Sequence, residues 1–161
     1  MNKFGKRLCI AGAVLGTVHA VYFYCKEKNQ KKIIQLTKET DKWNQMFRFM
    51  DNWMNQKIKG NKIEDYLLNK GYRNIAIYGM SYIGQTLINE LEGSEICIKY
   101  GIDRDSEVYW DKFPIVNPQE ITEDVDVVIV TALSFFNEVR NILQDRINCP
   151  VISLEEIIDT L

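Results

Sequence analysis

Hydrophobic and polar positions follow three different patterns along the chain. Residues 8–25 are eighteen residues without a formal charge. Residues 30–70 repeat apolar side chains at steps of three and four, which predicts amphipathic helix. From residue 72 onward, short apolar runs alternate with helical patterns. We therefore expect three parts: a membrane anchor with basic flanks (1–30), a helical segment (31–70) and an α/β domain (71–161).

The third part has the alternation of strand and helix that is typical of a parallel sheet. The run Val125-Asp-Val-Val-Ile-Val130 is strongly apolar, as a central parallel strand must be. The pattern predicts an α/β fold with a five-stranded parallel sheet of order 3-2-1-4-5. We expect strands at 74–78, 95–102, 114–116, 125–130 and 150–153, a helical turn at 118–120, and helices at 82–91, 135–146 and 154–161.

The second part is expected to form an amphipathic helix that ends near Ile58, because Gly60-Asn61 follows. A short second helix is expected at 62–69. The spacing of the apolar stripe indicates either a coiled coil or a face turned toward the core. Trp43 and Trp53 are expected to cover the domain or a second copy of this helix. The stripe consists of Ile33, Leu36, Thr40, Trp43, Phe47, Met50 and Met54.

Residues 8–25 are expected to form a transmembrane helix. Eighteen residues at about 1.5 Å each reach roughly 27 Å, adequate for a hydrocarbon core of about 30 Å. Three basic residues precede the run and four follow within eight positions, which weakly places the C-terminal side in the cytoplasm as a single-pass protein. Two alternatives stay open: a cleaved signal peptide, since Val18-His19-Ala20 resembles a cleavage site, and a buried soluble helix.

Two features predict a homodimer through residues 8–25 and 33–58. Small residues recur in Gly12-x-x-x-Gly16-x-x-x-Ala20, a spacing that allows close approach of membrane helices. The apolar stripe of residues 33–54 would extend that contact.

Composition excludes several classes of function. The formal net charge is −2, with both signs interspersed, so we expect no nucleic-acid partner. The four cysteines include no C-x-x-C pair, so we expect no metal site, and unpaired thiols agree with a reducing compartment. The single histidine, His19, lies in the first apolar run, which removes a histidine base from the α/β domain.

A glycine loop follows the first expected strand. The sequence Gly79-Met-Ser-Tyr-Ile-Gly84 is the dinucleotide fingerprint G-x-G-x-x-G with serine at the middle position. The helix N-terminus that it opens attracts anions. Ser81 adds a side chain where pyrophosphate approaches, so a phosphate would sit farther off or meet the hydroxyl. The alternative for Ser81 is a helix N-cap. The candidate phosphate-binding residues are Gly79, Met80, Ser81, Tyr82, Ile83 and Gly84.

Residues after two later strands complete the candidate site. Asp103 ends the second strand 24 residues after Gly79, near the spacing at which an acidic residue takes ribose hydroxyls. Arg104 would stack on a base or meet a phosphate. Thr131, after the fourth strand, would line the same crevice. The alternative for residues 103–106 is a solvated turn.

From Trp43 onward the chain resembles Rossmann modules found with bacterial capsule and cell-envelope polysaccharide machinery. More distantly, it is similar to the nucleotide-binding parts of sugar-nucleotide epimerases and dehydratases, and to UDP-sugar-binding domains in front of sugar acyltransferases. The group's loop typically reads G-M-G-x-x-G, from which Ser81 departs. The residues that carry the resemblance are Asp51-Asn-Trp-Met54, Ile75-Ala-Ile-Tyr-Gly-Met80, Gly101-Ile-Asp103, Val127-Val-Ile-Val-Thr-Ala132 and Pro150-Val-Ile-Ser-Leu-Glu-Glu156.

The resemblance implies NAD(P) or a nucleotide-sugar as ligand, and an accessory role beside a glycosyltransferase or polysaccharide assembly complex. Such modules usually lack a catalytic domain. The longest insertion, residues 105–113, contains Tyr109, Trp110 and Asp111 but no base–nucleophile pair, so no catalytic residue is assigned. The alternatives are a scaffold that binds no nucleotide and a small NAD(P)-dependent enzyme that modifies sugar nucleotides.

Overall fold

The computed structural model describes residues 3–105, 109–121 and 124–161, with the backbone alone for residues 3–18, 20 and 21. The chain divides into two compact units, Met1–Gln45 and Met46–Leu161. The second unit therefore includes residues 46–70, which precede the expected α/β part.

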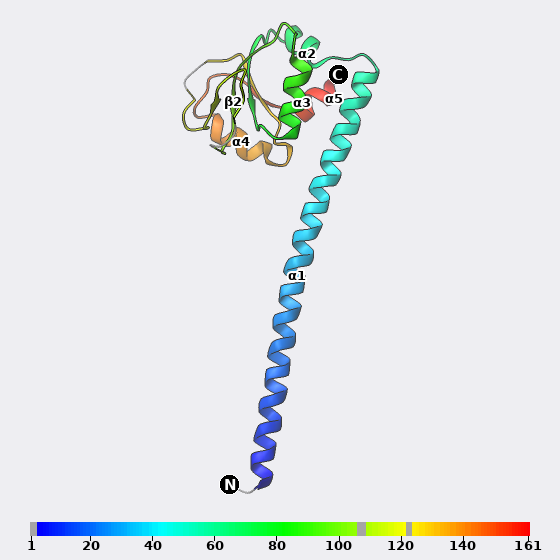
Figure 1. The fold of residues 1–161 in the computed structure, drawn as a ribbon, viewed down its shortest axis with the longest axis vertical. Helices are drawn as coiled ribbons and strands as arrows, with labels where there is room; N and C mark the ends of the chain where they lie inside the picture. Colours follow the sequence, from blue (N-terminus) through cyan, green and yellow to red (C-terminus); the bar gives the residue numbers. More distant parts are fainter. Residues whose placement is uncertain (1–2, 106–108, 122–123) are drawn as a thin grey trace. The chain divides into compact units, whose positions relative to one another are not determined.

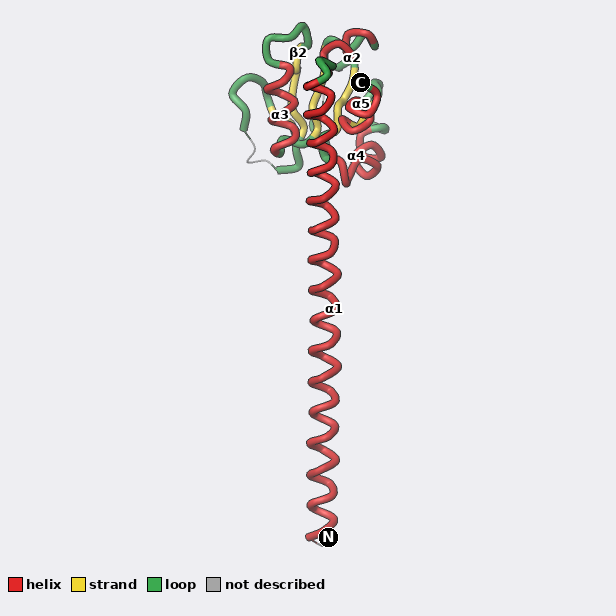
Figure 2. Tube along the Cα trace, turned by 90° about the vertical axis from the view of Figure 1, so that its right-hand side faces the viewer, coloured by secondary structure: helices red, strands yellow, loops and turns green. Residues whose placement is uncertain are grey.

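A single helix, α1, runs from Lys3 to Ile58 (Figure 2). The expected helical segments of residues 8–25 and 33–58 are both parts of it. Among the helices whose side chains the structure describes, none is long and apolar enough to span a membrane. Most side chains of the expected transmembrane run, those of residues 8–18, 20 and 21, lie outside that described set.

The second unit contains the expected five-stranded parallel sheet (Figure 1). Its order, β3-β2-β1-β4-β5, confirms the predicted order. The strands are β1 (Asn74–Tyr78), β2 (Cys97–Ile102), β3 (Ile115–Val116), β4 (Val127–Val130) and β5 (Val151–Ser153). The other helices are α2 (Ile63–Asn69), α3 (Tyr82–Leu91), the 3-10 turn η1 (Leu133–Phe135), α4 (Phe136–Leu143) and α5 (Leu154–Thr160).

Two strands begin two residues later than expected, β2 at Cys97 and not at 95, and β4 at Val127 and not at 125, and two expected helical elements also differ. Residues 118–120 form a turn, closed by the bond from the Glu120 N–H to the Asn117 carbonyl at 2.8 Å, and not a helical turn. The helix expected at 135–146 ends at Leu143, because the chain tightens there and the Arg146 N–H bonds the Leu143 carbonyl. Both are differences at the ends of elements, where local hydrogen bonds decide.

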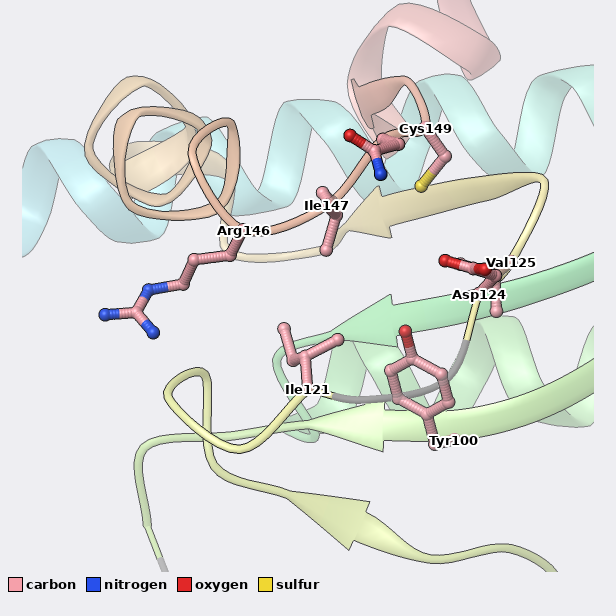
Figure 3. A pocket seen from close by; sticks show the side chains of 8 residues that line it. Tyr100, Ile121, Asp124, Val125, Arg146, Ile147 and Cys149 are labelled. Carbon is pink, nitrogen blue, oxygen red and sulfur yellow. The ribbon is translucent and has the colours of Figure 1, made fainter.

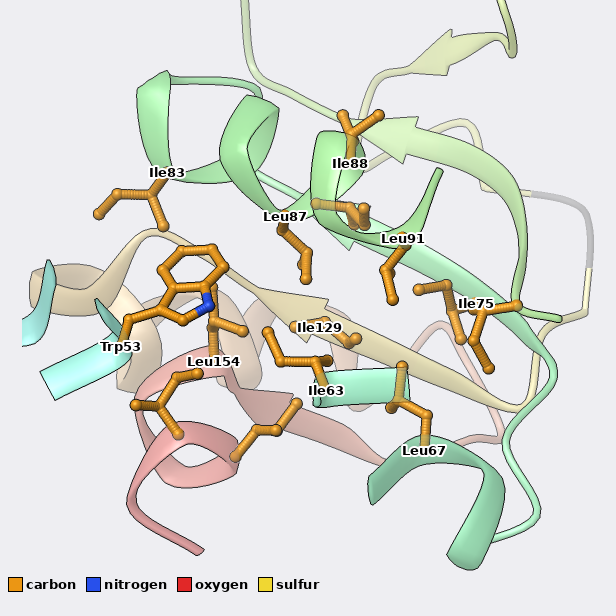
Figure 4. Packing of buried hydrophobic residues seen from close by; sticks show 14 of the residues in the cluster. Trp53, Ile63, Leu67, Ile75, Ile83, Leu87, Ile88, Leu91, Ile129 and Leu154 are labelled. Atoms are coloured by element: carbon orange, nitrogen blue, oxygen red, sulfur yellow. The ribbon is translucent and has the colours of Figure 1, made fainter. Parts of the chain in front are cut away.

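The side chains of β1 and β4 alternate between two apolar clusters, one on each face of the sheet. On one face, Ile75 and Ile129 meet α2, α3, α5 and the end of α1 (Figure 4). On the other, Ala76 and Val128 meet α4 and the segment around Ile121. Burial on both faces explains why these strands are continuously apolar.

The end of α1 contributes to the core through Trp53, whose expected position over the domain is confirmed, and through Phe49, which lies outside the predicted stripe. Phe49 and Trp53 are 4% and 2% exposed, and the Trp53 indole N–H donates to Glu90 Oε2 at 2.8 Å. Phe47 and Met54 of the predicted stripe are 73% and 58% exposed. The interpretation of the stripe as a core-facing surface is therefore wrong at these two positions. Aromatic side chains four residues apart supply the area that the sheet face needs.

The carboxylate of Asp126 holds the start of β1. Its Oδ2 accepts the backbone N–H of Asn74 at 2.6 Å and that of Arg73 at 2.8 Å. These bonds favour the charged form and lower the pKa of Asp126 below its ordinary value. Asp126 therefore makes folding stability depend on pH.

Because the pKa of Asp126 is lower in the folded chain, its stabilisation is complete above the unfolded pKa of about 3.9 and is lost as pH falls through the folded value. Asp126→Asn should lower the melting temperature at neutral pH and flatten its fall below about pH 4. Thermal unfolding followed by circular dichroism between pH 2 and 7 measures both effects. Asp124→Asn, at an exposed carboxylate nearby, is the control; equal behaviour of the two variants would contradict the prediction.

Candidate functional site

The glycine loop between β1 and α3 is held by close contact of its two glycines. Gly79 has φ +96°, a left-handed conformation that favours glycine. A Cβ on Gly84 would lie 2.1 Å from the Gly79 carbonyl oxygen, and no side chain fits there. The first and last positions of the fingerprint therefore need glycine for the reasons that the motif predicts.

The first turn of α3 presents backbone N–H groups. The amides of Ser81, Tyr82, Ile83 and Gly84 hydrogen-bond to no described residue. Ser81 occupies the N-cap position, with φ −71° and ψ −173°, but its side chain makes no capping bond. Its φ shows that the middle position of this loop does not need glycine for its backbone conformation. The exposed hydroxyl and these amides are the groups of the loop that an anion can contact.

Three side chains of the predicted set face the interior and support the loop. Met80 and Ile83 are 4% and 7% exposed and belong to the core cluster on the α3 face. Thr131 is 1% exposed, and its Oγ1 lies 2.7 Å from the Gly79 carbonyl oxygen and 3.0 Å from that of Tyr78. Tyr82, in contrast, is 81% exposed. The side chains available to a ligand at this loop are thus Ser81 and Tyr82.

Asp103 links the end of β2 to the glycine loop. Its Oδ2 accepts the Met80 N–H at 2.8 Å, and its Oδ1 accepts the Asp105 N–H at 3.0 Å. The structure therefore places Asp103 beside the loop, as the spacing predicts, but gives its carboxylate a supporting role as well. A carboxylate has about four acceptor positions, so these two bonds leave capacity for a hydroxyl.

Arg104 is tied to two neighbouring elements. Its guanidinium donates to Glu138 Oε1 on α4 at 2.7 Å and to the Tyr78 hydroxyl at 3.1 Å. These two bonds, with Glu138 the larger cause, raise the pKa of Arg104 above its ordinary value. The Arg104 and Glu138 side chains are each 54% exposed, so the ion pair is solvated and exchangeable.

A depression of about 630 Å³ adjoins Arg104 at the carboxyl ends of β2 and β3. Its wall includes the side-chain amides of Asn117, Gln119 and Asn141, which no sequence motif singled out. The turn residues Asn117-Pro118 directly after a predicted strand are the only signal that could have indicated them. The full lining is Arg104, Asn117, Pro118, Gln119, Asn141, Ile142, Asp145 and Arg146.

A second cavity, of about 270 Å³, lies toward the amino ends of β4 and β5 and is therefore separate from the glycine loop (Figure 3). Burial raises the pKa of the Cys149 thiol in its wall. The Arg146 side chain points away from Tyr100 and Cys149 (Figure 3). The carboxylate of Asp124, which lines the same cavity, adds to this rise in pKa, so the Cys149 thiol is a poor nucleophile.

Thr131→Val should destabilise the domain by about 1–3 kcal/mol, because the Gly79 carbonyl oxygen loses its hydroxyl partner, whereas the Tyr78 carbonyl oxygen keeps the Thr131 N–H. Thr131→Ser keeps the hydroxyl, so its free energy of unfolding should fall much less. Urea unfolding of the three proteins measures the difference. Equal stability of the valine and native proteins would show that the hydroxyl does not support the loop.

Comparison with known proteins places this domain in a family. The family model described as C2185-like, N-terminal, matches residues 71–154, just over half of the 161-residue chain. The match includes the glycine loop, Asp103, Arg104 and Thr131. No curated protein and no solved structure matches the chain. The chain belongs to the C2185-like N-terminal family.

Proposed function

We propose that this protein binds a nucleotide or nucleotide-sugar at the carboxyl edge of the sheet, with a phosphate at the glycine loop and the nucleoside toward Arg104. The observation that carries the proposal is the bond from the Met80 N–H to Asp103, which joins the glycine loop to the end of β2. The open amides of α3 and the Asp103 carboxylate thereby lie at one loop, and Arg104, the next residue in the chain, lies in the wall of the depression. In parallel α/β sheets, this edge is where ligands bind.

The phosphate position rests on the electrostatics of the α3 N-terminus. Several aligned N–H groups without acceptors carry a partial positive charge that attracts an anion. Because Ser81 is exposed and its hydroxyl makes no bond to a described residue, it adds a donor to the amides. A phosphate would contact this hydroxyl and stand farther from the backbone than at a loop with three glycines.

The nucleoside position rests on the groups that surround Asp103 and Arg104. The spare acceptor positions of the Asp103 carboxylate suit ribose hydroxyls. Amide side chains such as Asn117, Gln119 and Asn141 donate and accept hydrogen bonds, as recognition of a base edge or a sugar requires. The chemistry of the depression therefore favours a polar, hydrogen-bonding group over an apolar one.

The wider role that we propose is an accessory one. The resemblance to capsule and cell-envelope modules suggests NAD(P) or a nucleotide-sugar as ligand, and service to a glycosyltransferase or polysaccharide assembly complex. The uncharged run of residues 8–25 with basic residues on both sides favours attachment to a membrane, with the sheet domain in the cytoplasm. This tether would hold the bound nucleotide near enzymes that work at the membrane surface.

Substitution of Ser81→Asp tests the phosphate position. Aspartate is as good an N-cap as serine, so the melting temperature without ligand should not fall. Its charge should repel a phosphate, and the ligand-induced rise in melting temperature should disappear. In the native protein, a ligand at about 100 times its Kd stabilises by about 2.7 kcal/mol, a shift of several degrees. Thermal shift with NAD(H), NADP(H), UDP-sugars and coenzyme A measures it.

The matched control is Asn89→Asp, which adds the same charge at an exposed position farther along α3 and should keep the ligand-induced shift. If no member of the panel shifts the native protein, the nucleotide proposal fails. If Ser81→Asp protein keeps the full shift, the ligand binds away from the glycine loop.

Membrane attachment has its own test. The full chain expressed in bacteria should stay in the membrane fraction after an alkaline carbonate wash, which removes peripheral proteins. Leu15→Arg, near the middle of the run, should release a large share of the protein, because a charge at the bilayer centre costs about 2.5–3.5 kcal/mol on insertion scales. Full release of the native chain by carbonate would exclude a transmembrane anchor.

A further inference from the structure

The stripe of α1 that the sequence singled out remains exposed apart from Met50. In the first unit, Ile33, Leu36 and Trp43 are 62%, 52% and 62% exposed. In the second unit, Phe47 and Met54 are 73% and 58% exposed, although the Phe49–Trp53 face of the same helix is buried. Exposed aromatic and aliphatic side chains aligned along one helix face indicate a contact with another molecule.

The spacing of the stripe is that of a heptad repeat. With Ile33 at position a, the a positions are Ile33, Thr40, Phe47 and Met54, and the d positions are Leu36, Trp43 and Met50. No charged residue occupies a or d between 33 and 54. The ion pair of Lys31 with Glu27 and the bond from Gln35 to Glu39 lie outside the a and d positions. An apolar repeat with a period of 3.5 residues is typical of helices that form a coiled coil with another helix carrying the same repeat.

Thr40, the polar residue of the stripe, can be buried without leaving a hydrogen-bond donor unsatisfied. The Thr40 hydroxyl already donates to the Leu36 carbonyl of its own helix at 2.9 Å. A partner helix would therefore cover a satisfied hydroxyl and a methyl group, not an unpaired donor.

We infer that a second copy of this chain covers the stripe, and that the two α1 helices form a parallel, in-register coiled coil over residues 33–47. The coiled coil ends there because Met50 packs against the core of its own domain. Charges flanking the seam agree with this pairing. In register, Lys32 at g faces Thr37 at e of the other copy, and Glu39 faces Asn44, so no like charges meet. Each layer then pairs a residue with itself.

The parallel direction of the two helices is inferred from Asn29, which lies one helical turn before the stripe. The heptad continues backward to Asn29 at position d, which is exposed and polar. In a parallel pair, Asn29 faces Asn29 and the two amides can hydrogen-bond across the seam, a known means of fixing register. In an antiparallel pair that sets Leu36 against Phe47, Asn29 would instead face the apolar Met54 and leave its amide without a partner.

Cysteine cross-linking in the full chain tests the pairing. In a background with Cys9, Cys25, Cys97 and Cys149 replaced by alanine, Leu36→Cys should give a covalent dimer on copper-phenanthroline oxidation. Lys38→Cys, at the outward position f, is the matched control and should stay monomeric on a non-reducing gel. Equal cross-linking of both variants would indicate random collision and overturn the inference. Cross-linking of a mixture of Leu36→Cys and Phe47→Cys chains, without that of Leu36→Cys alone, would overturn the parallel direction.

Light scattering on the purified full chain gives a second measurement. The native chain should have the mass of a dimer, and Phe47→Glu should shift it to a monomer while retaining its circular dichroism spectrum, since Phe47 is 73% exposed. Gln45→Glu adds the same charge at position f and should remain a dimer. A native chain that is monomeric at micromolar concentration would overturn the inference, and so would a Phe47→Glu variant that stays dimeric.

Discussion

The burial of β1 and β4 on both faces is the constraint on which the rest of the domain depends. A parallel strand without an exposed face needs helices on each side, because apolar area left in water costs stability. On the α3 face, part of that cover comes from Phe49 and Trp53 of α1. The family match begins at residue 71, but the core of the domain begins some twenty residues earlier. The end of α1, from Met46 onward, is therefore a part of the folded domain.

Residues of the glycine loop also make structural contacts within the domain. Several residues that the motif would assign to a ligand stabilise the loop. The Thr131 hydroxyl lies between two carbonyl oxygens, and the Met80 side chain packs in the core. The Asp103 carboxylate accepts the Met80 N–H. What these supports leave open is the backbone at the start of α3 and the Ser81 hydroxyl. The proposed binding of a phosphate uses those groups alone, whereas the Asp103 carboxylate would both support the loop and accept ribose hydroxyls.

The order of the sheet and the position of the loop could be predicted from sequence because each depends on a short-range signal. The strands β1 and β2 end directly before Gly79 and Asp103, and alternation with helices restricts the topology. The cover that Trp53 gives the domain could be predicted, but the burial of Phe49 could not, because apolar side chains lie on both faces of this part of α1 and the contacts with α5 and α3 choose between them. The pairing of Arg104 with Glu138 and the amide-lined depression join segments far apart in the chain, for which periodicity carries no information.

The contact between Gly84 and the Gly79 carbonyl has a consequence for selectivity. Because the start of α3 packs this closely on the Gly79 carbonyl, the loop has little room to rearrange around a ligand. The loop would then lose little conformational entropy when a ligand binds, so a small ligand would need few contacts. At the proposed site, discrimination between ligands would then come from their size and charge.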